Sequence, residues 1–345
     1  MEVKKIVPFR FANNTALCLS PEFILPEEKR PCLCDVSSMH SVPIIDLKGY
    51  DECEHGLVQK ISEVSQQWGM FQVINHGVSP DLCRGVLAAL LEFFQLPPEE
   101  RSIFFTKDHS EPVKILNYYF NGSDQKKVAM WSETFTHPWH PTEDFKHYLP
   151  TNPPQYRDVF AAYAKEAGTL MNRLLSLMSQ GLGLEEGSLV RRLGANPNFY
   201  SHANYYPPCP EPELTMGLNE HNDITALTIL QLNGVPGLQV EYDGKWVPVD
   251  PVPDAFVIIV ADQIQVLSNG RYKSPAHRAV TNRWLSRLSL AMFYAPNDEV
   301  VIGPMEELTD EELPPIYRNY RHKEYMEEFY RQQGKRRRVK EAFEL

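Results

Sequence analysis

The sequence predicts a mainly β core with flanking helices, in which one long helix packs against the sheet. The first observation is a change of character between residues 199 and 296, where short β-rich runs alternate with turn signals. The second is a long apolar stripe at helical spacing within residues 155–181. Closely spaced strands joined by such turns are typical of a β-sandwich or jelly roll.

Composition and charge narrow the class of protein. The chain has 345 residues, of which 43% are hydrophobic, enough to bury a large core in one domain or two. Its net charge of −11 argues against nucleic acid as a partner. The chain has no run of about eighteen apolar residues, and its start, MEVKKI, lacks the apolar core of a signal peptide. We therefore expect a cytoplasmic monomer that binds a small molecule and neither membrane nor nucleic acid.

The six cysteines are spread along the chain, and only Cys32 and Cys34 are close, with one residue between them. Without a matching second pair, this spacing is weak support for a zinc site. Reduced thiols in a cytosolic protein are the simpler interpretation.

Four regions are expected along the chain. Residues 1–40 are broken by prolines and should lie as an N-terminal arm on the surface. Residues 41–195 should be mostly helical, with strands that pack on the core. Residues 196–300 should form the jelly-roll core, and residues 301–345 a C-terminal helical segment.

The second region carries most of the helix signals. Helices are indicated by apolar residues at a spacing of three or four, and Ser79-Pro80 supplies an N-cap and a first-turn proline. Residues 105–150 are polar, aromatic and without clear period. The expected elements are a strand at 42–47, a helix around 57–68, a strand at 70–74, a helix from 79 to the stop at Pro97-Pro98, and the long helix at 155–181.

The long helix and the end of the chain each have two interpretations. The helix stripe is expected to pack against a sheet rather than to bind a cofactor, and consists of Tyr156, Phe160, Tyr163, Ala167, Leu170, Leu174 and Leu177. Residues 256–260 are apolar throughout, as in a strand buried on both faces. The basic cluster at 335–340 resembles a nuclear-import signal, although such runs are more often solvated helix faces.

One histidine, one aspartate and a second histidine are the candidate metal ligands. His221 and Asp223 are two residues apart, so on a strand their side chains leave the same face. His277 can supply a third ligand from a distant strand. Two imidazoles and one carboxylate form the facial triad of non-haem Fe(II) oxygenases, which leaves coordination positions open. An H-x-D triplet also occurs by chance, and a lone histidine in a strand is usually a core or surface residue.

Repetition of the same spacing supports the metal interpretation. Asn204 and Tyr206 are two residues apart, and so are Arg287 and Ser289. Residues 287–293 alternate with strand period, which places Arg287, Ser289 and Phe293 on one face. A guanidinium, a hydroxyl and an aromatic ring on one inward face indicate a cavity rather than a plain core.

These motifs carry a family resemblance that extends over nearly the whole chain from about residue 40. The sequence resembles the plant 2-oxoglutarate- and Fe(II)-dependent dioxygenases, which include anthocyanidin synthase, flavonol synthase, hyoscyamine 6-hydroxylase and the gibberellin oxidases. The matching stretches are 42–47, 69–77, 204–210 (NYYPPCP), His221-x-Asp223, 235–239 (VPGLQ), Asp262-Gln263, 268–274 (SNGRYKS), His277-Arg278 and Arg287-x-Ser289. Two positions depart from the family pattern, Asn222 where threonine or serine is frequent and Ala261 where glycine is frequent. The side chain of Asn222 should point away from the metal.

The resemblance implies a double-stranded β-helix and a set of ligands. It implies that His221, Asp223 and His277 bind Fe(II), and that Arg287 and Ser289 hold the distal carboxylate of 2-oxoglutarate, with Tyr206 and Asn204 adding a hydroxyl and an amide. A guanidinium suits this task because it binds a carboxylate through two parallel hydrogen bonds. The implied reaction is oxidation of a small plant specialised metabolite, such as a flavonoid, phenolic or alkaloid, by hydroxylation, desaturation, cyclisation or demethylation. It consumes O₂, decarboxylates 2-oxoglutarate to succinate and uses ascorbate as reductant.

Substrate contacts and two competing functions complete the expectations. The residues expected to contact the substrate are Phe293, Phe135, Thr134, Thr136 and His202. Core packing is the alternative for the two phenylalanines, and a structural or exposed position for His202. The chain could also be an Fe(II) oxidase of the same fold that does not use 2-oxoglutarate, or a jelly-roll binding protein without turnover.

Overall fold

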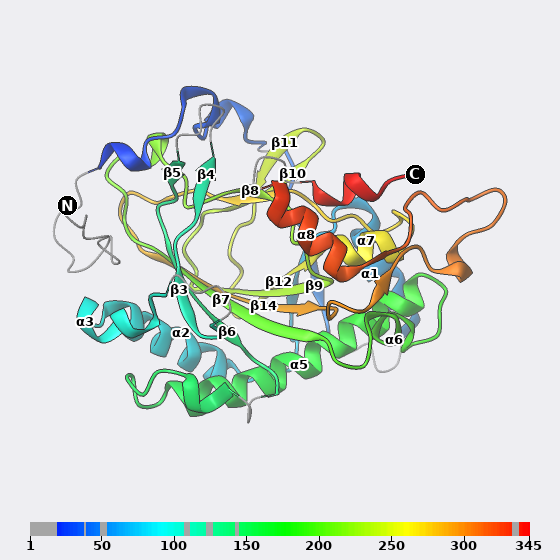
Figure 1. Cartoon of the computed structure of the whole chain (residues 1–345), viewed down its shortest axis with the longest axis horizontal. Helices are drawn as coiled ribbons and strands as arrows, with labels where there is room; N and C mark the ends of the chain where they lie inside the picture. Colours follow the sequence, from blue (N-terminus) through cyan, green and yellow to red (C-terminus); the bar gives the residue numbers. More distant parts are fainter. Residues whose placement is uncertain are drawn as a thin grey trace.

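Two β-sheets face each other, and helices cover the outer face of the larger sheet (Figure 1). The structure is a computed structural model that describes residues 19–37, 39–48, 54–106, 111–121, 127–141, 145–332 and 338–345. The two facing sheets form a jelly-roll core, as the turn-rich sequence predicts.

The larger sheet has eight strands among the described residues, in the order β1-β2-β12-β9-β14-β7-β6-β3. They are β1 (Ile44–Asp46), β2 (Met70–Ile74), β12 (Phe256–Val260), β9 (Leu227–Leu232), β14 (Arg287–Ala295), β7 (Asn198–Tyr206), β6 (Glu133–Pro138) and β3 (Lys114–Leu116). β7 and β14 pair antiparallel along their full length, with Arg287 opposite Tyr206 and Ser289 opposite Asn204. This register brings two distant pairs of the sequence to one end of the sheet. β12 is buried at every position, as predicted.

The smaller sheet carries the first and the last of the candidate metal ligands. Its described strands are β11 (Lys245–Pro248), β10 (Leu238–Tyr242), β13 (His277–Ala279) and β8 (Leu218–His221), in that order. Residue His277 is the direct cross-strand partner of His221. Two-residue turns with positive φ favour Asp-Gly, and Asp243 and Gly244 between β10 and β11 have φ values of 49° and 72°. Two short pairs complete the strands, β4 (Tyr119–Asn121) with β5 (Lys127–Ala129) and β15 (Val301–Ile302) with β16 (Tyr320–Arg321).

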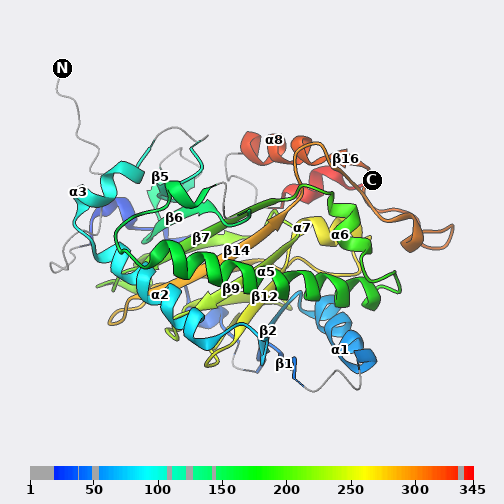
Figure 2. The same cartoon turned by 90° about the horizontal axis from the view of Figure 1, so that it is seen from below.

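The long predicted helix is α5, and it lies against the outer face of the larger sheet beside α2 (Figure 2). Every residue of its apolar stripe is buried in the main core. The described α-helices are α1 (Glu54–Gln67), α2 (Pro80–Gln95), α3 (Pro98–Arg101), α5 (Tyr156–Gly181), α6 (Ser188–Leu193), α7 (Asp262–Leu267) and α8 (His322–Gln332). Ser79 precedes α2 as expected, but its side chain makes no capping hydrogen bond, and its N–H donates to Glu166 Oε2 over 2.7 Å. No helix among the described residues is both long and apolar enough to cross a membrane.

Short 3₁₀ turns occur in the expected arm, between the regular elements and in the C-terminal segment, where the sequence predicts helix. They are η1 (Pro21–Phe23), η2 (Glu27–Lys29), η3 (Leu33–Asp35), η4 (Ser102–Phe104), η5 (Lys146–Tyr148), η6 (Pro212–Leu214), η7 (Glu306–Leu308) and η8 (Val339–Phe343). Residues 19–37 of the expected surface arm are anchored rather than loose, because Phe23 and Leu25 are buried. The ring of Phe23 packs edge-on against Trp131, with centroids 4.8 Å apart.

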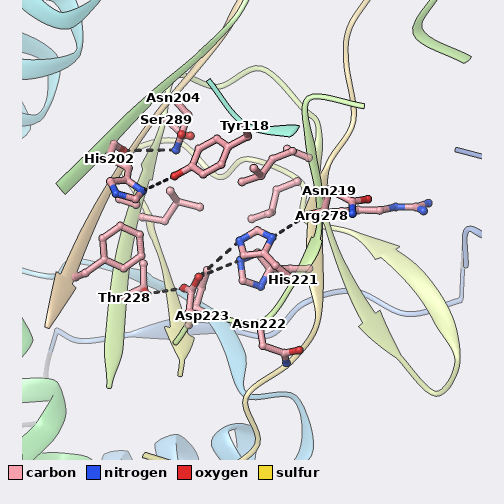
Figure 3. A pocket seen from close by; sticks show the side chains of 18 of the residues that line it. Tyr118, His202, Asn204, Asn219, His221, Asn222, Asp223, Thr228, Arg278 and Ser289 are labelled. Atoms are coloured by element: carbon pink, nitrogen blue, oxygen red, sulfur yellow. Dashed lines mark hydrogen bonds and ion pairs between the residues drawn. The ribbon is translucent and has the colours of Figure 1, made fainter. Parts of the chain in front are cut away.

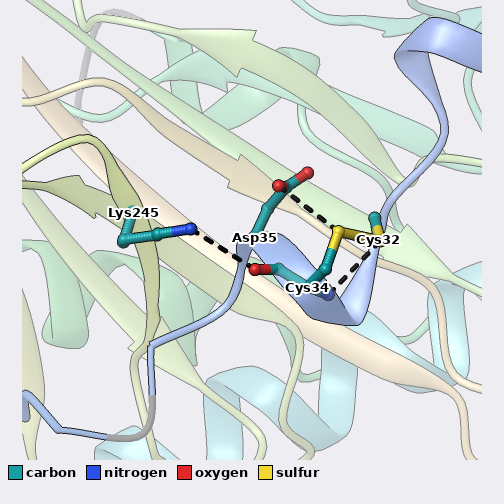
Figure 4. The surroundings of a disulfide bond; sticks show 4 residues. All are labelled: Cys32, Cys34, Asp35 and Lys245. Carbon is teal, nitrogen blue, oxygen red and sulfur yellow. Dashed lines mark hydrogen bonds between the residues drawn. A yellow bond between two sulfur atoms is a disulfide. The ribbon is translucent and has the colours of Figure 1, made fainter.

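The expectation that all cysteines are reduced is wrong for one pair. Cys32 and Cys34 form a disulfide, with their Cα atoms 5.3 Å apart, close enough for a bridge across a single residue (Figure 4). This exposed turn lies against the tip of the β10–β11 hairpin, where Lys245 Nζ donates to the Cys34 carbonyl. Cys83 and Cys209 are free and buried, and Cys18 and Cys53 lie outside the described residues.

The C-terminal segment is less helical than expected. Only α8 is an α-helix within the described part of residues 301–345, and η7 and η8 are 3₁₀ turns. Residues 335–337 of the basic cluster lie outside the described residues. Lys340 is not on a solvated helix face, because it is buried and its Nζ lies 2.6 Å from Asp262 Oδ1.

Candidate functional site

A cavity lies between the two sheets, and both contribute side chains to it (Figure 3). The smaller sheet contributes His221 and His277 from β8 and β13. The larger sheet contributes alternate residues of β7 and β14, since Arg287, Ser289 and Phe293 face the cavity. Leu288, Leu290 and Met292 of β14 face the helices instead and join the main core. The alternation in the sequence therefore predicts the inward face of this strand correctly.

His221, Asp223 and His277 meet at one place in the cavity. The Nε2 atoms of His221 and His277 lie 3.7 Å and 3.6 Å from Asp223 Oδ1. One ligand atom from each residue can be chosen so that all three lie within 4.8 Å of one another. Asp223 and His277 are buried and His221 is partly exposed. Three donors are thus gathered at one point from residues up to 56 positions apart in sequence.

Hydrogen bonds hold the three side chains with one donor atom each toward the shared point. Nδ1 of His221 lies 2.8 Å from the Asn219 carbonyl, and Nδ1 of His277 lies 3.2 Å from the Pro275 carbonyl. A carbonyl only accepts, so we assign the hydrogen of each imidazole to Nδ1, and Nε2 is then the ring nitrogen that can bind a metal. Thr228 Oγ1 donates to Asp223 Oδ2 over 2.6 Å, which leaves Oδ1 facing the histidines. Two neutral imidazoles and one carboxylate suit Fe(II) and leave room for further ligands.

A buried guanidinium lies on the β14 side of the same cavity. Arg287 is 2% exposed, and its Nε and Nη1 atoms donate to no described residue. Burial is the main cause that lowers the pKa of Arg287. An unpaired buried cation is costly, so these two donors call for an anion in the cavity. Ser289, Tyr206 and Asn204 line the cavity beside it, and a carboxylate fits this set of donors.

Burial also raises the pKa of the Tyr206 hydroxyl, which keeps this group protonated and able to donate. The ring of Tyr206 lies under the guanidinium of Arg287, with Cζ 4.9 Å from the ring centroid. The amide of Asn204 is held by Thr134, whose hydroxyl donates to Asn204 Oδ1 over 2.7 Å. We call these seven residues the metal end of the cavity: His221, Asp223, His277, Arg287, Ser289, Tyr206 and Asn204.

The other part of the cavity is lined by rings. Tyr200 stacks on Phe293 with centroids 4.8 Å apart, and His202 meets Phe293 edge-on at 5.0 Å. Tyr118 Oη lies 3.1 Å from His202 Nδ1, and the two side chains face each other in Figure 3. Burial lowers the pKa of His202 to about 4, so the imidazole is neutral near pH 7. Phe329 of α8 also lines the cavity, and we call these five aromatic residues the aromatic end: Tyr118, Tyr200, His202, Phe293 and Phe329.

Three residues expected at the substrate lie elsewhere. Phe135 is fully buried in the main core, where its ring packs on Phe93 with centroids 4.5 Å apart. Its position on β6 places it on the helix-covered face of the sheet, so core packing is the correct interpretation. Thr134 and Thr136 alternate with Phe135, yet neither lines the cavity. Thr134 instead supports Asn204, as described above.

Several lining residues were missed in the sequence. Tyr200 continues the two-residue series of His202, Asn204 and Tyr206, so extending that alternation by one step would have found it. Tyr118 belongs to the stretch without clear period, and nothing in the sequence indicates that Phe329 reaches the cavity. Arg278 lines the cavity through part of its side chain, but its guanidinium is directed away from the metal ligands (Figure 3). The guanidinium stacks on Trp246 instead, with Cζ 4.1 Å from the ring centroid. Asn222 points away from the ligands, as expected, and donates to the Ser274 carbonyl.

Fold and site together define a class: a jelly-roll non-haem Fe(II) oxygenase with a cationic pocket for an anionic cosubstrate. Comparison with known sequences agrees. Residues 198–296 match the 2OG-Fe(II) oxygenase superfamily, and residues 42–157 match the family described as non-haem dioxygenase in morphine synthesis N-terminal. The chain is 38% identical over 310 residues to flavanone 3-dioxygenase 2 of Oryza sativa subsp. japonica, covering 90% of this chain and 89% of that protein. It is 37% identical to Protein DOWNY MILDEW RESISTANCE 6 of Arabidopsis thaliana, covering 94% of both chains.

A solved structure is similar over the same length. The crystal structure of JOX2 in complex with 2OG, Fe and JA superposes with a TM-score of 0.85 at 34% identity, covering 96% of this chain and 95% of that one. The chain belongs to the 2OG-Fe(II) oxygenase superfamily, among its plant dioxygenases. It is therefore an oxidoreductase that depends on Fe(II) and 2-oxoglutarate, consumes O₂ and, as is typical of this class, uses ascorbate as reductant.

Proposed function

We propose that this dioxygenase oxidises a small aromatic plant metabolite, with flavonoids, phenolics and alkaloids as the substrate classes to test. The observation that carries the proposal is the aromatic end itself, where Tyr200 and Phe293 stack beside the neutral pair of His202 and Tyr118. Aromatic rings contribute large apolar contact area, and a planar substrate fits between them. The relative named flavanone 3-dioxygenase 2 supports a flavonoid as the first candidate.

The metal end is proposed to hold iron and the cosubstrate. His221, Asp223 and His277 would bind Fe(II) through Nε2, Oδ1 and Nε2, and the backbone carbonyls behind the histidines fix their orientation. Arg287 and Ser289 would bind the distal carboxylate of 2-oxoglutarate, with Tyr206 and Asn204 alongside. Bound iron supplies the activation of O₂ that is coupled to decarboxylation of the cosubstrate.

Residues of the chain would orient the organic substrate in the cavity and exclude water from it. Phe293 and Tyr200 exclude water and hold a ring against one wall of the cavity. His202 is neutral and Tyr118 lies within hydrogen-bond distance of it, so this pair can present a donor or an acceptor to a substrate hydroxyl or carbonyl. Thr228 keeps Oδ2 of Asp223 engaged, so that the carboxylate presents a single oxygen to the metal.

Three further expectations remain proposals. A monomer located in the cytoplasm is consistent with the acidic composition. The division into regions at residues 40, 195 and 300 also remains a prediction. Residues 333–337 are not described, and whether the basic cluster directs nuclear import is a question for a localisation experiment.

The proposal is tested by succinate release from protein loaded with Fe(II) without oxygen and then given 2-oxoglutarate, ascorbate and O₂. A panel of flavonoid, phenolic and alkaloid compounds is added singly. We expect one class to stimulate succinate release, with succinate and oxidised product formed in equal amounts. Asp223→Ala should abolish the release, and Glu220→Ala, at an exposed acid of β8, should not.

Each of the other outcomes would contradict one part of the proposed function. A product formed without succinate would indicate the oxidase that does not use 2-oxoglutarate. Iron binding without stimulation by any aromatic compound would contradict the substrate class. Absence of iron binding would leave the jelly-roll binding protein as the better interpretation.

A further inference from the structure

We propose that the C-terminal segment is part of the active site, because Lys340, Asp262 and Tyr325 form a latch that positions the loop carrying Asp223 and the side chain of Phe329. The inference rests on the proposed role of Asp223 as an iron ligand. The latch residues touch neither iron nor substrate and are positioning residues, whereas Phe329 lines the cavity itself.

The latch is a buried cluster around one carboxylate. Asp262 opens α7 and is fully buried. Its Oδ1 lies 2.6 Å from Nζ of Lys340, and its Oδ2 accepts a hydrogen bond of 2.5 Å from the hydroxyl of Tyr325. Lys340 is itself 6% exposed, so the ion pair is almost dry. Both carboxylate oxygens are therefore bound by side chains of the C-terminal segment.

The backbone on the other side of Asp262 holds the loop that carries the metal ligand. The N–H of Asp262 donates to the carbonyl of Asp223 over 2.9 Å. The next residue, Gln263, donates from its N–H to Thr225 O over 3.0 Å and from Nε2 to Ile224 O over 2.9 Å. Residues 223–225 thus rest on three hydrogen bonds from the first two residues of α7.

The C-terminal segment reaches Gln263 as well. The hydroxyl of Tyr320 donates to Gln263 Oε1 over 2.8 Å. Tyr320 and Tyr325 both pack on Phe343 of η8, with ring centroids 4.3 Å and 5.5 Å away. In both overall views α8 and the end of the chain lie near α7 (Figures 1 and 2). The side chains of this segment therefore fix the orientation of both residues that support the metal loop.

The same helix carries a residue of the aromatic end. Phe329 follows Tyr325 by four positions on α8, so the two side chains project from the same face of the helix. Tyr325 is bound to Asp262, while Phe329 lines the cavity beyond it. Loosening the latch is therefore expected to affect both iron affinity and the fit of the organic substrate.

The first test measures binding of Fe(II) without oxygen, by the charge-transfer absorption that forms when 2-oxoglutarate joins the bound metal. Lys340→Met should raise the Kd for Fe(II) about 10-fold, a loss typical of groups that orient a metal ligand. Lys340→Arg keeps a cation beside Asp262, so its Kd for Fe(II) should lie between those of the wild type and Lys340→Met. Arg338→Met removes an exposed cation two residues away and should bind Fe(II) as the wild type does.

A milder variant serves as a control in case Lys340→Met does not fold. Tyr325→Phe removes only the hydroxyl that contacts Asp262 and keeps the ring packing, so it serves if Lys340→Met does not fold. A folded Tyr325→Phe or Lys340→Met protein with wild-type affinity for Fe(II) would overturn the latch. If the wild type itself forms no charge-transfer band, the proposed iron site fails, and the latch fails with it. The two failures are thus distinguishable.

The second test addresses Phe329. Phe329→Ala should raise KM for the organic substrate about 10-fold while leaving the Kd for 2-oxoglutarate unchanged, because it removes apolar contact from the aromatic end alone. Glu327 is exposed on the same helix, so Glu327→Ala is the control and should change neither value. An unchanged KM in Phe329→Ala, or an equal rise in Glu327→Ala, would contradict a substrate contact at Phe329.

Discussion

The two ends of the cavity are built in different ways. At the metal end the candidate metal ligands are positioned by defined partners, such as the Asn219 carbonyl behind His221 and the Thr228 hydroxyl on Asp223. At the aromatic end the side chains are held mainly by ring packing, as between Tyr200 and Phe293. The metal end thus fixes one geometry, whereas the aromatic end offers apolar surface that tolerates changes of shape.

Substrate specificity can therefore change at the aromatic end while the metal end keeps its chemistry. The metal end uses four strands, β7, β8, β13 and β14, and the turn after β8, all within the jelly-roll core. The aromatic end also draws on Tyr118, which precedes β4, and on Phe329 in α8, both outside that core. Substitutions of Tyr118 and Phe329 themselves, unlike those of the latch residues, can therefore reshape the substrate site while the ligands stay in place. The following predictions test whether the two ends are separable in this way.

The largest effect is expected at the metal ligands. His277→Ala removes one of three donors and should lower turnover at least about 10³-fold, because iron is no longer held beside the cosubstrate. Release of succinate and bound iron per chain are the measurements. His147→Ala, at an exposed histidine, is the control and should retain both succinate release and bound iron. Substantial turnover in His277→Ala would remove this residue from the ligand set.

A smaller but selective loss is expected for the buried guanidinium. Arg287→Lys keeps the positive charge and loses the planar pair of donors, so KM for 2-oxoglutarate should rise by about 10- to 100-fold. The KM of the organic substrate should change little, since Arg287 belongs to the metal end. Steady-state kinetics with each substrate varied in turn measures both. Equal rises in the two KM values would mean that the ends are not separable.

The aromatic end should show the opposite selectivity. Phe293→Ala removes the ring that stacks on Tyr200, and we expect KM for the organic substrate to rise about 10-fold with unchanged KM for 2-oxoglutarate. Phe293→Leu should lie closer to the wild type because it restores part of the apolar volume. A rise confined to the KM for 2-oxoglutarate would place Phe293 at the metal end.

The smallest effect concerns pH and the neutral His202. Its pKa in the folded protein is lowered to about 4 by burial, below the value of about 6.5 in an unfolded chain. Between these two values the unfolded state binds the extra proton, so stability is complete above pH 6.5 and falls as pH decreases toward 4. His202 alone should contribute a slope of about 1.4 kcal/mol per pH unit in the apo protein.

Urea unfolding at several pH values between 6.5 and 4.5 measures this slope. His202→Asn should have a shallower slope than the wild type, and His147→Asn, at an exposed position, should not. Burial similarly lowers the pKa values of His137 and His322 to about 4, so most of the pH dependence should persist in His202→Asn. Identical slopes in His202→Asn and the wild type would contradict the buried neutral imidazole.

The sequence could predict the metal end far better than the aromatic end. Arg287 and Ser289 are two residues apart on a regular strand, so the local periodicity alone predicts that they share a face. Phe135 follows the same periodicity but on the helix-covered face, and no local pattern tells which face of β6 is inward. The sequence therefore leaves both interpretations of Phe135 open, and the structure places its side chain in the core.

The positions of residues outside the long strands could not be predicted from the sequence, because they depend on tertiary contacts or on segments too short to show a period. β3 and β4 have three residues each, too few to show a period, so the segment around Tyr118 gave no signal. Lys340 belongs to a basic run typical of solvent-exposed residues, yet tertiary contact with Asp262 buries it. The same limit applies to Cys32 and Cys34, whose pairing depends on the conformation of one turn.

The central claim, that the metal end is complete without the aromatic end, can be tested before any substrate is known. Fe(II) and 2-oxoglutarate are titrated without oxygen into the wild type, Arg287→Lys and Phe293→Ala, and the charge-transfer absorption is followed. The wild type and Phe293→Ala should bind 2-oxoglutarate equally, and Arg287→Lys should bind it at least about 10-fold more weakly. Equal binding by Arg287→Lys and the wild type, or equal weakening in both variants, would contradict the claim.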